Sequence, residues 1–141
     1  ARLNIEPSIA AMAARQRTDA TLSRVQSVLD VARASIYDAV ATMEFDRDFH
    51  LAIAESTCNP VLAQVMSGIT DLMAQELWLT MMTNSVVATP GRWQQALDEH
   101  RGVFEAVEAQ SPGAAEQRMR AHLQRVEQVM LEAELLEKRE A

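Results

Sequence analysis

Three of the four prolines follow a residue type that caps helices, and this divides the chain into helical segments. The pairs are Asn59-Pro60, Thr89-Pro90 and Ser111-Pro112. Asn, Thr and Ser side chains accept a hydrogen bond from the free N–H groups of a first helical turn. Proline fits the first helical position because its missing N–H has no helical partner there. Each pair therefore predicts the start of a helix.

Apolar residues recur at steps of three and four along most of the chain, which is the spacing of one buried helix face. The first such stripe is Ile5, Ile9, Met12 and Ala13, with Pro7 either in the first turn or at a kink. A second segment begins with Thr18 as its N-cap. Ser35 with Asp38 resembles a capping box, so a break is expected near residues 35–38.

The remaining segments complete a pattern of six helices. A third helix is expected from about Asp38 to Ser56, and the fourth carries the stripe Leu62, Val65, Ile69 and Leu72. The fourth becomes apolar on all sides over residues 77–82, which predicts core packing or, alternatively, the lining of a ligand site. Residues 83–88 are expected to form a loop, and the last helix is expected to run to about Lys138.

Short connections between these helices predict an all-α, antiparallel bundle. Hydrophobic residues make up 48% of the 141 residues, which is enough for the core of one domain covering residues 1–141. With only four glycines and four prolines, the many tight turns of a β-sandwich are not expected.

The charge of the chain disfavours direct binding to nucleic acid. Thirteen basic and 20 acidic residues give a formal net charge of −7, and all the basic residues except Lys138 are Arg. Binding to a duplex depends largely on neutralising phosphates, which requires a basic surface.

A cytoplasmic location is expected. Cys58 is the single cysteine, so no disulfide forms within the chain. No apolar run approaches the roughly 20 residues that a membrane span needs, and the N-terminus lacks the pattern of a signal peptide. The chain begins at Ala1 without methionine, and we expect it to be part of a longer protein.

All three histidines fall on predicted core faces, together with one aspartate. His50, His100 and His122 each lie at helical spacing from several apolar residues, and Asp46 precedes His50 by one turn. The apolar neighbours are Met43, Phe49 and Ile53 for His50; Trp93, Leu97, Phe104 and Val107 for His100; and Ala115, Met119, Val126 and Val129 for His122.

This placement predicts a metal site. Side chains at positions i and i+4 reach the same point beside a helix, so Asp46 and His50 can share one ion. A buried carboxylate needs a partner, and a divalent cation with neutral imidazoles supplies one. The four residues fit a closed tetrahedral zinc site or a six-coordinate metal with two positions left for other oxygen ligands. Hydrogen-bonded core histidines without any metal remain the alternative.

Four groups of residues follow the order and spacing of a known family. They are Arg2, Ile5, Glu6 and Pro7 with Ala13 and Ala14; Asp46, Phe49 and His50 with Asn59, Pro60 and Leu62; His100, Val103, Ala106 and Val107; and Ala115, Met119, His122 and Leu123. These groups resemble the motifs R-x-x-L-E-P … A-A, D-x-x-F-H … N-P-x-L, H-x-x-I-x-x-A-I and A-x-x-x-M-x-x-H-L of the FCD domain. This domain is the C-terminal, effector-binding part of FadR-type transcription regulators of the GntR superfamily.

The resemblance implies a bundle of six or seven helices that binds a metal and a small organic acid. Metal-binding members use one Asp and three His, and this sequence has Asp46, His50, His100 and His122 at those positions. The implied cofactor is a divalent ion, with zinc, nickel or manganese expected. The implied effector is a small carboxylate with one oxygen on the metal, and Arg2 is the candidate for pairing with the rest; a frayed terminal arginine in solvent is the alternative.

The resemblance also implies partners. Family members form homodimers and carry an N-terminal winged helix–turn–helix domain, which is absent here. DNA binding is therefore expected only through that missing domain, and no membrane association is expected.

Two other functions are alternatives to a sensor. A helical-bundle metalloenzyme, hydrolase-like, would use the same Asp/His3 site, but the chain has neither Glu-x-x-His pairs nor H-E-x-x-H. Glu44 and Glu55 are nearby in sequence, but charges on a solvated face explain them better than a catalytic base. A purely structural dimerisation bundle with buried histidines is the third possibility.

Overall fold

The computed structural model describes residues 1–34, 39–73 and 91–140, and within these ranges the chain is helical apart from short turns. The all-α prediction is confirmed for this part of the chain, which contains no strand. In chain order the helices are α1 (Arg2–Gln16), α2 (Asp19–Ala34), α3 (Ala39–Glu55), α4 (Pro60–Met73), α6 (Arg92–Glu108) and α7 (Pro112–Glu140).

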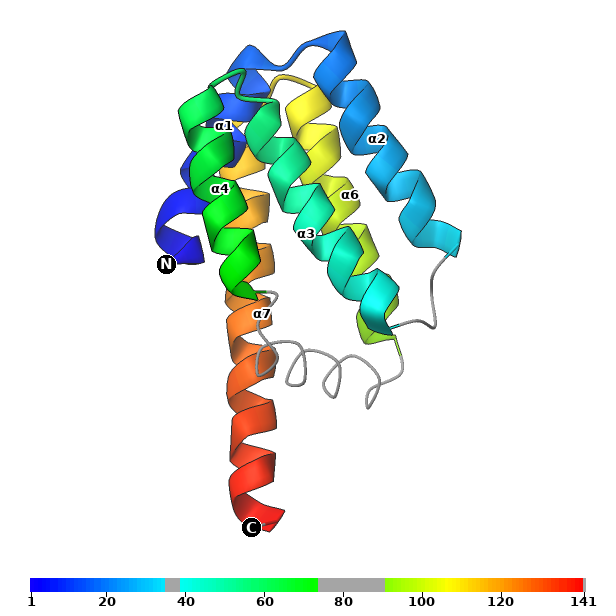
Figure 1. Ribbon diagram of the computed structural model, residues 1–141, viewed down its shortest axis with the longest axis vertical. Helices are drawn as coiled ribbons and strands as arrows, with labels where there is room; N and C mark the ends of the chain where they lie inside the picture. Colours follow the sequence, from blue (N-terminus) through cyan, green and yellow to red (C-terminus); the bar gives the residue numbers. More distant parts are fainter. Residues whose placement is uncertain (35–38, 74–90, 141) are drawn as a thin grey trace.

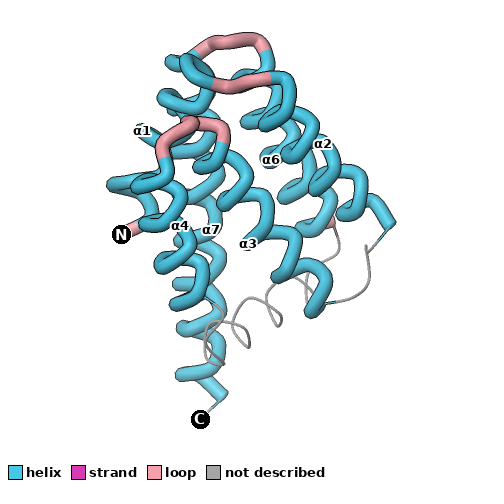
Figure 2. The backbone as a smooth tube through the Cα atoms, turned by 45° about the horizontal axis from the view of Figure 1, so that its top comes forward, coloured by secondary structure: helices cyan, strands magenta, loops and turns pink. Residues whose placement is uncertain are grey.

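The helices form an antiparallel bundle. The turns between α1 and α2, α3 and α4, and α6 and α7 all lie at the same end of the bundle (Figures 1 and 2). α1 packs mainly along α7, α7 also packs along α6, and α3 lies between α2 and α4. The last turns of α7 project beyond the other described helices (Figure 1).

Two predicted helix caps are confirmed. The Thr18 hydroxyl accepts a hydrogen bond from the Thr21 N–H at 3.2 Å, and the Thr21 hydroxyl accepts one from the Thr18 N–H at 2.9 Å. Asn59 Oδ1 accepts a hydrogen bond from the Val61 N–H at 3.0 Å. These bonds satisfy N–H groups that the first helical turn leaves free.

The described residues refine two local predictions. α6 begins at Arg92, with Gly91 as its N-cap at a φ of 85°. Glycine adopts this left-handed conformation without a steric penalty. Pro7 lies inside α1, beyond the first turn, which excludes the first of its two predicted positions. Four of the sequence predictions lie outside the described residues: the break at residues 35–38, the apolar stretch 77–82, the loop 83–88 and the Thr89-Pro90 pair.

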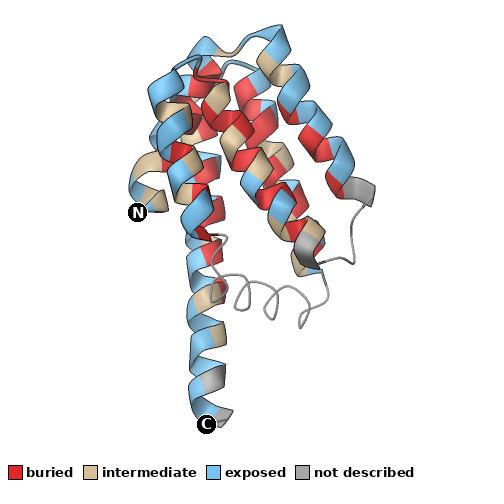
Figure 3. Ribbon diagram, in the orientation of Figure 1, coloured by how far each residue is buried: buried red, intermediate tan, exposed pale blue. Residues whose placement is uncertain are grey.

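The buried faces of α6 and α7 are those that the sequence predicts. The residues sharing a face with His100 and with His122 are all buried, and these faces point into the bundle (Figure 3). In α1, Met12 is an exception, with 37% of its surface exposed, whereas Ile9 and Ala13 are buried as predicted.

The predicted face of α4 is only half confirmed. Leu62 and Ile69 pack against the core, but Val65 and Leu72 are exposed. The helix also buries Met66, Thr70 and Met73. Apolar residues occur on several sides of α4, so their spacing does not single out one face. No helix in the described ranges is both long and apolar enough to cross a membrane.

Candidate metal centre

Asp46, His50, His100 and His122 meet inside the bundle. Asp46 and His50 come from α3, His100 from α6 and His122 from α7. Each offers one ligand atom, and these four atoms lie within 4.8 Å of one another. All four residues are buried, and the three histidines are at most 2% exposed. The structure thus brings together the whole set that the sequence proposes as metal ligands.

The imidazole Nε2 atoms surround the Asp46 carboxylate. His100 Nε2 lies 3.1 Å from Asp46 Oδ1, and His50 Nε2 lies 3.5 Å from the same oxygen. His122 Nε2 is buried and has no hydrogen-bond partner among the described residues. A buried polar atom without a partner destabilises the fold, so this nitrogen indicates a binding site for an electron-pair acceptor such as a cation.

The Nδ1 atom of each histidine has a separate partner on the opposite side of its ring. His50 Nδ1 contacts Glu6 Oε2, His100 Nδ1 lies 2.6 Å from the Ala96 carbonyl oxygen, and His122 Nδ1 lies 2.7 Å from Glu99 Oε2. An Nδ1–H that donates to oxygen leaves the Nε2 lone pair free, which is the usual arrangement of metal-binding histidines. The donor set therefore fits a divalent cation, with His50 losing its proton on binding.

Two of these partners are themselves held by arginines. Arg2 Nε donates to Glu6 Oε1, and Arg125 Nε donates to Glu99 Oε1 at 2.5 Å. Glu6 is 2% exposed, whereas the Glu99 side chain is 23% exposed. Glu6, Glu99 and Arg125 are further functional candidates, of which the sequence motifs include only Glu6 and assign it no role.

The signal for Glu6 was present in the sequence. Glu6 lies three and four residues before Ile9 and Ala10, which are both buried, and four residues after Arg2. Charged residues at such positions are ordinarily assigned to the surface, which is why the pattern was missed.

Opposite charges hold the two buried carboxylates ionised. Burial alone would raise the pKa of Glu6, but His50 and Arg2 outweigh it and lower this pKa to about 2. Burial would likewise raise the pKa of Asp46, but the adjacent His50, His100 and Arg2 bring it well below its usual range. Both groups therefore remain anionic at neutral pH, as metal ligation and its support require.

The histidines differ in charge. Burial would lower the pKa of His50, but Glu6 and Asp46 overcome this effect and raise it. Burial lowers the pKa of His122 to about 3, and charge at His100 adds to the effect. His122 is thus a neutral imidazole throughout the physiological range, whereas the surroundings of His50 shift its equilibrium toward the protonated form.

Arg2 lies at the edge of this cluster and is not frayed into solvent. Its side chain is 12% exposed, and Nη1 lies 3.8 Å from Asp46 Oδ2. Neither Nη1 nor Nη2 has a hydrogen-bond partner among the described residues. The guanidinium therefore keeps free donors beside the proposed ligands.

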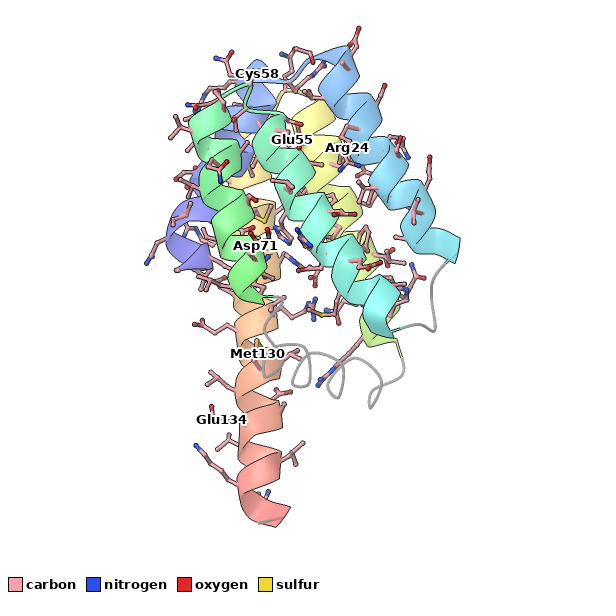
Figure 4. All side chains as sticks on the ribbon, in the orientation of Figure 1. Arg24, Glu55, Cys58, Asp71, Met130 and Glu134 are labelled. Carbon is pink, nitrogen blue, oxygen red and sulfur yellow. The ribbon has the colours of Figure 1, made fainter. Side chains whose placement is uncertain are left out.

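The acidic residues that were assigned to solvated faces lie there. Glu44 is exposed. Glu55 pairs with Arg24 at 3.7 Å on the outside of the bundle (Figure 4). Neither residue belongs to the Asp/His cluster.

Comparison with known proteins identifies the family. Residues 1–125 match the model of the FCD domain. The chain is 31% identical over 132 residues to the HTH-type transcriptional regulator LutR of Bacillus subtilis (strain 168), covering 89% of this chain and 57% of that protein. It is 34% identical over 113 residues to the galactonate operon transcriptional repressor of Escherichia coli (strain K12), covering 80% of this chain and 47% of that protein.

Other relatives agree. The putative L-lactate dehydrogenase operon regulatory protein of Escherichia coli (strain K12) is 31% identical over 130 residues, covering 92% of this chain and 49% of that protein. The solved structure of E. coli McbR/YncC has a TM-score of 0.70 at 17% identity, covering 93% of this chain and 61% of that one, and supports the fold.

The chain spans about half the length of these curated relatives. They are transcriptional regulators and not enzymes, which agrees with the prediction of a regulator. This chain belongs to the FCD family, the effector-binding domain of GntR-type transcription regulators.

Proposed function

We propose that this chain is the metal-dependent, effector-sensing and dimerising domain of a bacterial transcription regulator. The observation that carries the proposal is the meeting of Asp46, His50, His100 and His122 in the core, with each histidine Nδ1 in contact with an oxygen of another residue. These four residues would hold one divalent ion, zinc, nickel or manganese. When bound, the ion would offer a coordination position to an oxygen of the effector.

The proposed effector is a small carboxylate that pairs with Arg2. The free Nη1 and Nη2 groups beside Asp46 support this role, because a carboxylate would satisfy both of them. The names of two relatives concern galactonate and L-lactate, which are both 2-hydroxy acids. We therefore place 2-hydroxy acids first among the candidate effectors.

In the proposed whole protein, DNA is bound by a separate N-terminal winged helix–turn–helix domain, and residues 1–141 form one FCD domain. Exposed apolar residues support pairing of two copies: Val61, Val65 and Leu72 on α4, and Leu131 and Leu135 on α7. Effector binding would change DNA binding only as far as the effector prefers one arrangement of the dimer.

Metal content followed by ligand-induced stabilisation tests this function. The untagged protein is expected to hold close to one divalent ion per chain by elemental mass spectrometry. A panel of 2-hydroxy acids should then raise the melting temperature of the metal-loaded protein but not that of the metal-free protein. Arg2→Gln should weaken binding of the carboxylate by about tenfold or more without removing the metal.

The outcomes separate the two halves of the proposal. Absence of metal after loading would contradict the metal site and leave a structural bundle. Metal binding without any response to carboxylates would contradict the effector class alone. Chemical conversion of an acid during the assay would contradict the assignment as a sensor.

Metal affinity is expected to fall as the pH falls. Protonated His50 must lose its proton before Nε2 binds a cation, and its raised pKa means that this competition begins above pH 6.5. Below that pKa the apparent affinity should drop about tenfold per pH unit. His122, with a pKa of about 3, adds no competition at these pH values.

Chelator competition at pH 6, 7 and 8 measures this dependence. The stability of the metal-free protein should change in the opposite direction and decrease as the pH rises. The ion pairs of His50 stabilise the fold at low pH and are lost as the pH rises through its raised pKa. A metal affinity that is constant over this range would exclude His50 as a ligand.

A further inference from the structure

A small cavity adjoins three of the four proposed ligands. It has a volume of about 30 Å³, and its lining includes Asp46, His100, His122 and Trp93 together with apolar side chains, Thr42 and two arginines. One water needs roughly 10–15 Å³ of such volume. The cavity therefore accommodates about two oxygen-sized atoms next to the proposed metal.

One hydrogen-bond donor in the cavity wall lacks an acceptor. Trp93 is 8% exposed, and its indole Nε1 is buried without a hydrogen-bond partner among the described residues. Buried indole N–H groups ordinarily find a partner. We therefore expect its acceptor inside the cavity that Asp46, His100 and His122 also line.

The surroundings fix the position of this donor. The Trp93 ring meets Phe45 edge to face with 5.5 Å between ring centroids, and Phe45 in turn packs on His100 at 5.0 Å. Two arginines also line the cavity, but Arg125 is bound to Glu99 and Arg92 to Glu132. A neutral N–H such as that of Trp93 suits a hydroxyl or carbonyl oxygen as its acceptor.

We propose that the indole N–H of Trp93 binds a second oxygen of the effector, on the carbon next to the carboxylate, and so selects 2-hydroxy and 2-oxo acids over plain carboxylic acids. This inference rests on the proposed function, because it takes the carboxylate to be bound at the metal and Arg2. It adds a specificity-determining residue, Trp93, that acts by hydrogen bonding and not by metal ligation.

Pairs of acids that differ in one hydroxyl test the proposal on the metal-loaded protein. L-lactate is compared with propanoate, L-malate with succinate, and D-galactonate with its 2-deoxy analogue, by calorimetry. The wild type should bind the hydroxy acid of at least one pair more tightly by about tenfold. Trp93→Phe should reduce that preference at least fivefold while the affinities for metal and for the plain acid stay unchanged.

A matched control changes the same cavity without removing a donor. Met43 lines the cavity and is half-buried, so Met43→Leu should leave the preference for the hydroxy acid as it is in the wild type. Metal affinity and melting temperature, measured for both variants, test whether a change in the preference for the hydroxy acid arises from misfolding.

The indole signal of Trp93 gives a second measurement that does not need Trp93 to be replaced. Trp78→Phe leaves Trp93 as the sole tryptophan, and its ¹H–¹⁵N signal should move downfield when the hydroxy acid binds but not when the plain acid binds. A preference retained in Trp93→Phe together with an unmoved signal would overturn the role of Trp93 and leave the sensor intact. Failure of every acid to bind would overturn the effector class and this inference with it.

Discussion

Replacing His122 with alanine is expected to abolish metal retention. The substitution removes a buried Nε2 atom that has no hydrogen-bond partner among the described residues and leaves three of the four proposed ligands. Loss of a residue that only supports a ligand costs about 10- to 100-fold in metal affinity, and loss of the ligand itself should cost more than about 100-fold. Dialysed His122→Ala protein should therefore contain almost no metal by elemental mass spectrometry.

Met119→Leu is the matched control for this variant. Met119 lies on the same face of α7, one turn before His122, and is also buried at 1% exposure. A volume-conserving change there should cost less than about 1.5 kcal/mol of stability and leave one metal ion per chain. Full metal occupancy in His122→Ala would remove His122 from the site, and equal loss in both variants would indicate damage to the core instead.

The sequence predicts the helices well because their boundaries depend on local chemistry. Thr18 and Asn59 cap helices through bonds to residues two and three positions away, which is information that the sequence carries directly. The orientation of α4 is not local in this sense. Its Val65 and Met66 are both apolar, and only packing against α3 decides that Met66 is the buried one.

The same distinction applies to the candidate site. His100 and His122 lie within strongly apolar stripes, so their burial could be predicted residue by residue. Which histidine nitrogen faces Asp46 depends on the acceptor for the other nitrogen. Those acceptors, Glu6 and Glu99, come from different helices whose mutual rotation no spacing rule specifies.

The two acceptors form a chemically equivalent pair in unequal surroundings. Each glutamate joins one histidine Nδ1 to one arginine: Glu6 joins His50 to Arg2, and Glu99 joins His122 to Arg125. Glu6 is almost fully buried, but Glu99 reaches solvent. Water can replace part of the hydrogen bonding that Glu99 provides, whereas it cannot reach the site of Glu6. The charge of Glu6 should therefore matter more for folding.

Glu6→Gln is accordingly expected to destabilise the metal-free protein by about 3 kcal/mol at neutral pH, because it leaves His50 and Arg2 without their shared anion in the core. Glu99→Gln should cost less than about 1 kcal/mol, since its site is partly screened by solvent. Urea unfolding of the two variants and the wild type measures both differences.

The pH dependence of these differences separates the charge of Glu6 from its packing. A carboxylate whose pKa falls from 4.5 to about 2 on folding contributes stability that is complete above pH 4.5 and disappears as the pH approaches 2. The difference in the free energy of unfolding between wild type and Glu6→Gln should therefore shrink to zero as the pH falls from 4.5 toward 2. A stability difference that persists at pH 2 would show that the glutamine disturbs packing. Equal stability of the two proteins at pH 7 would show that Glu6 does not hold the charge on His50. Only a stability difference that shrinks in this way supports α1 as the helix that orients a metal ligand on α3.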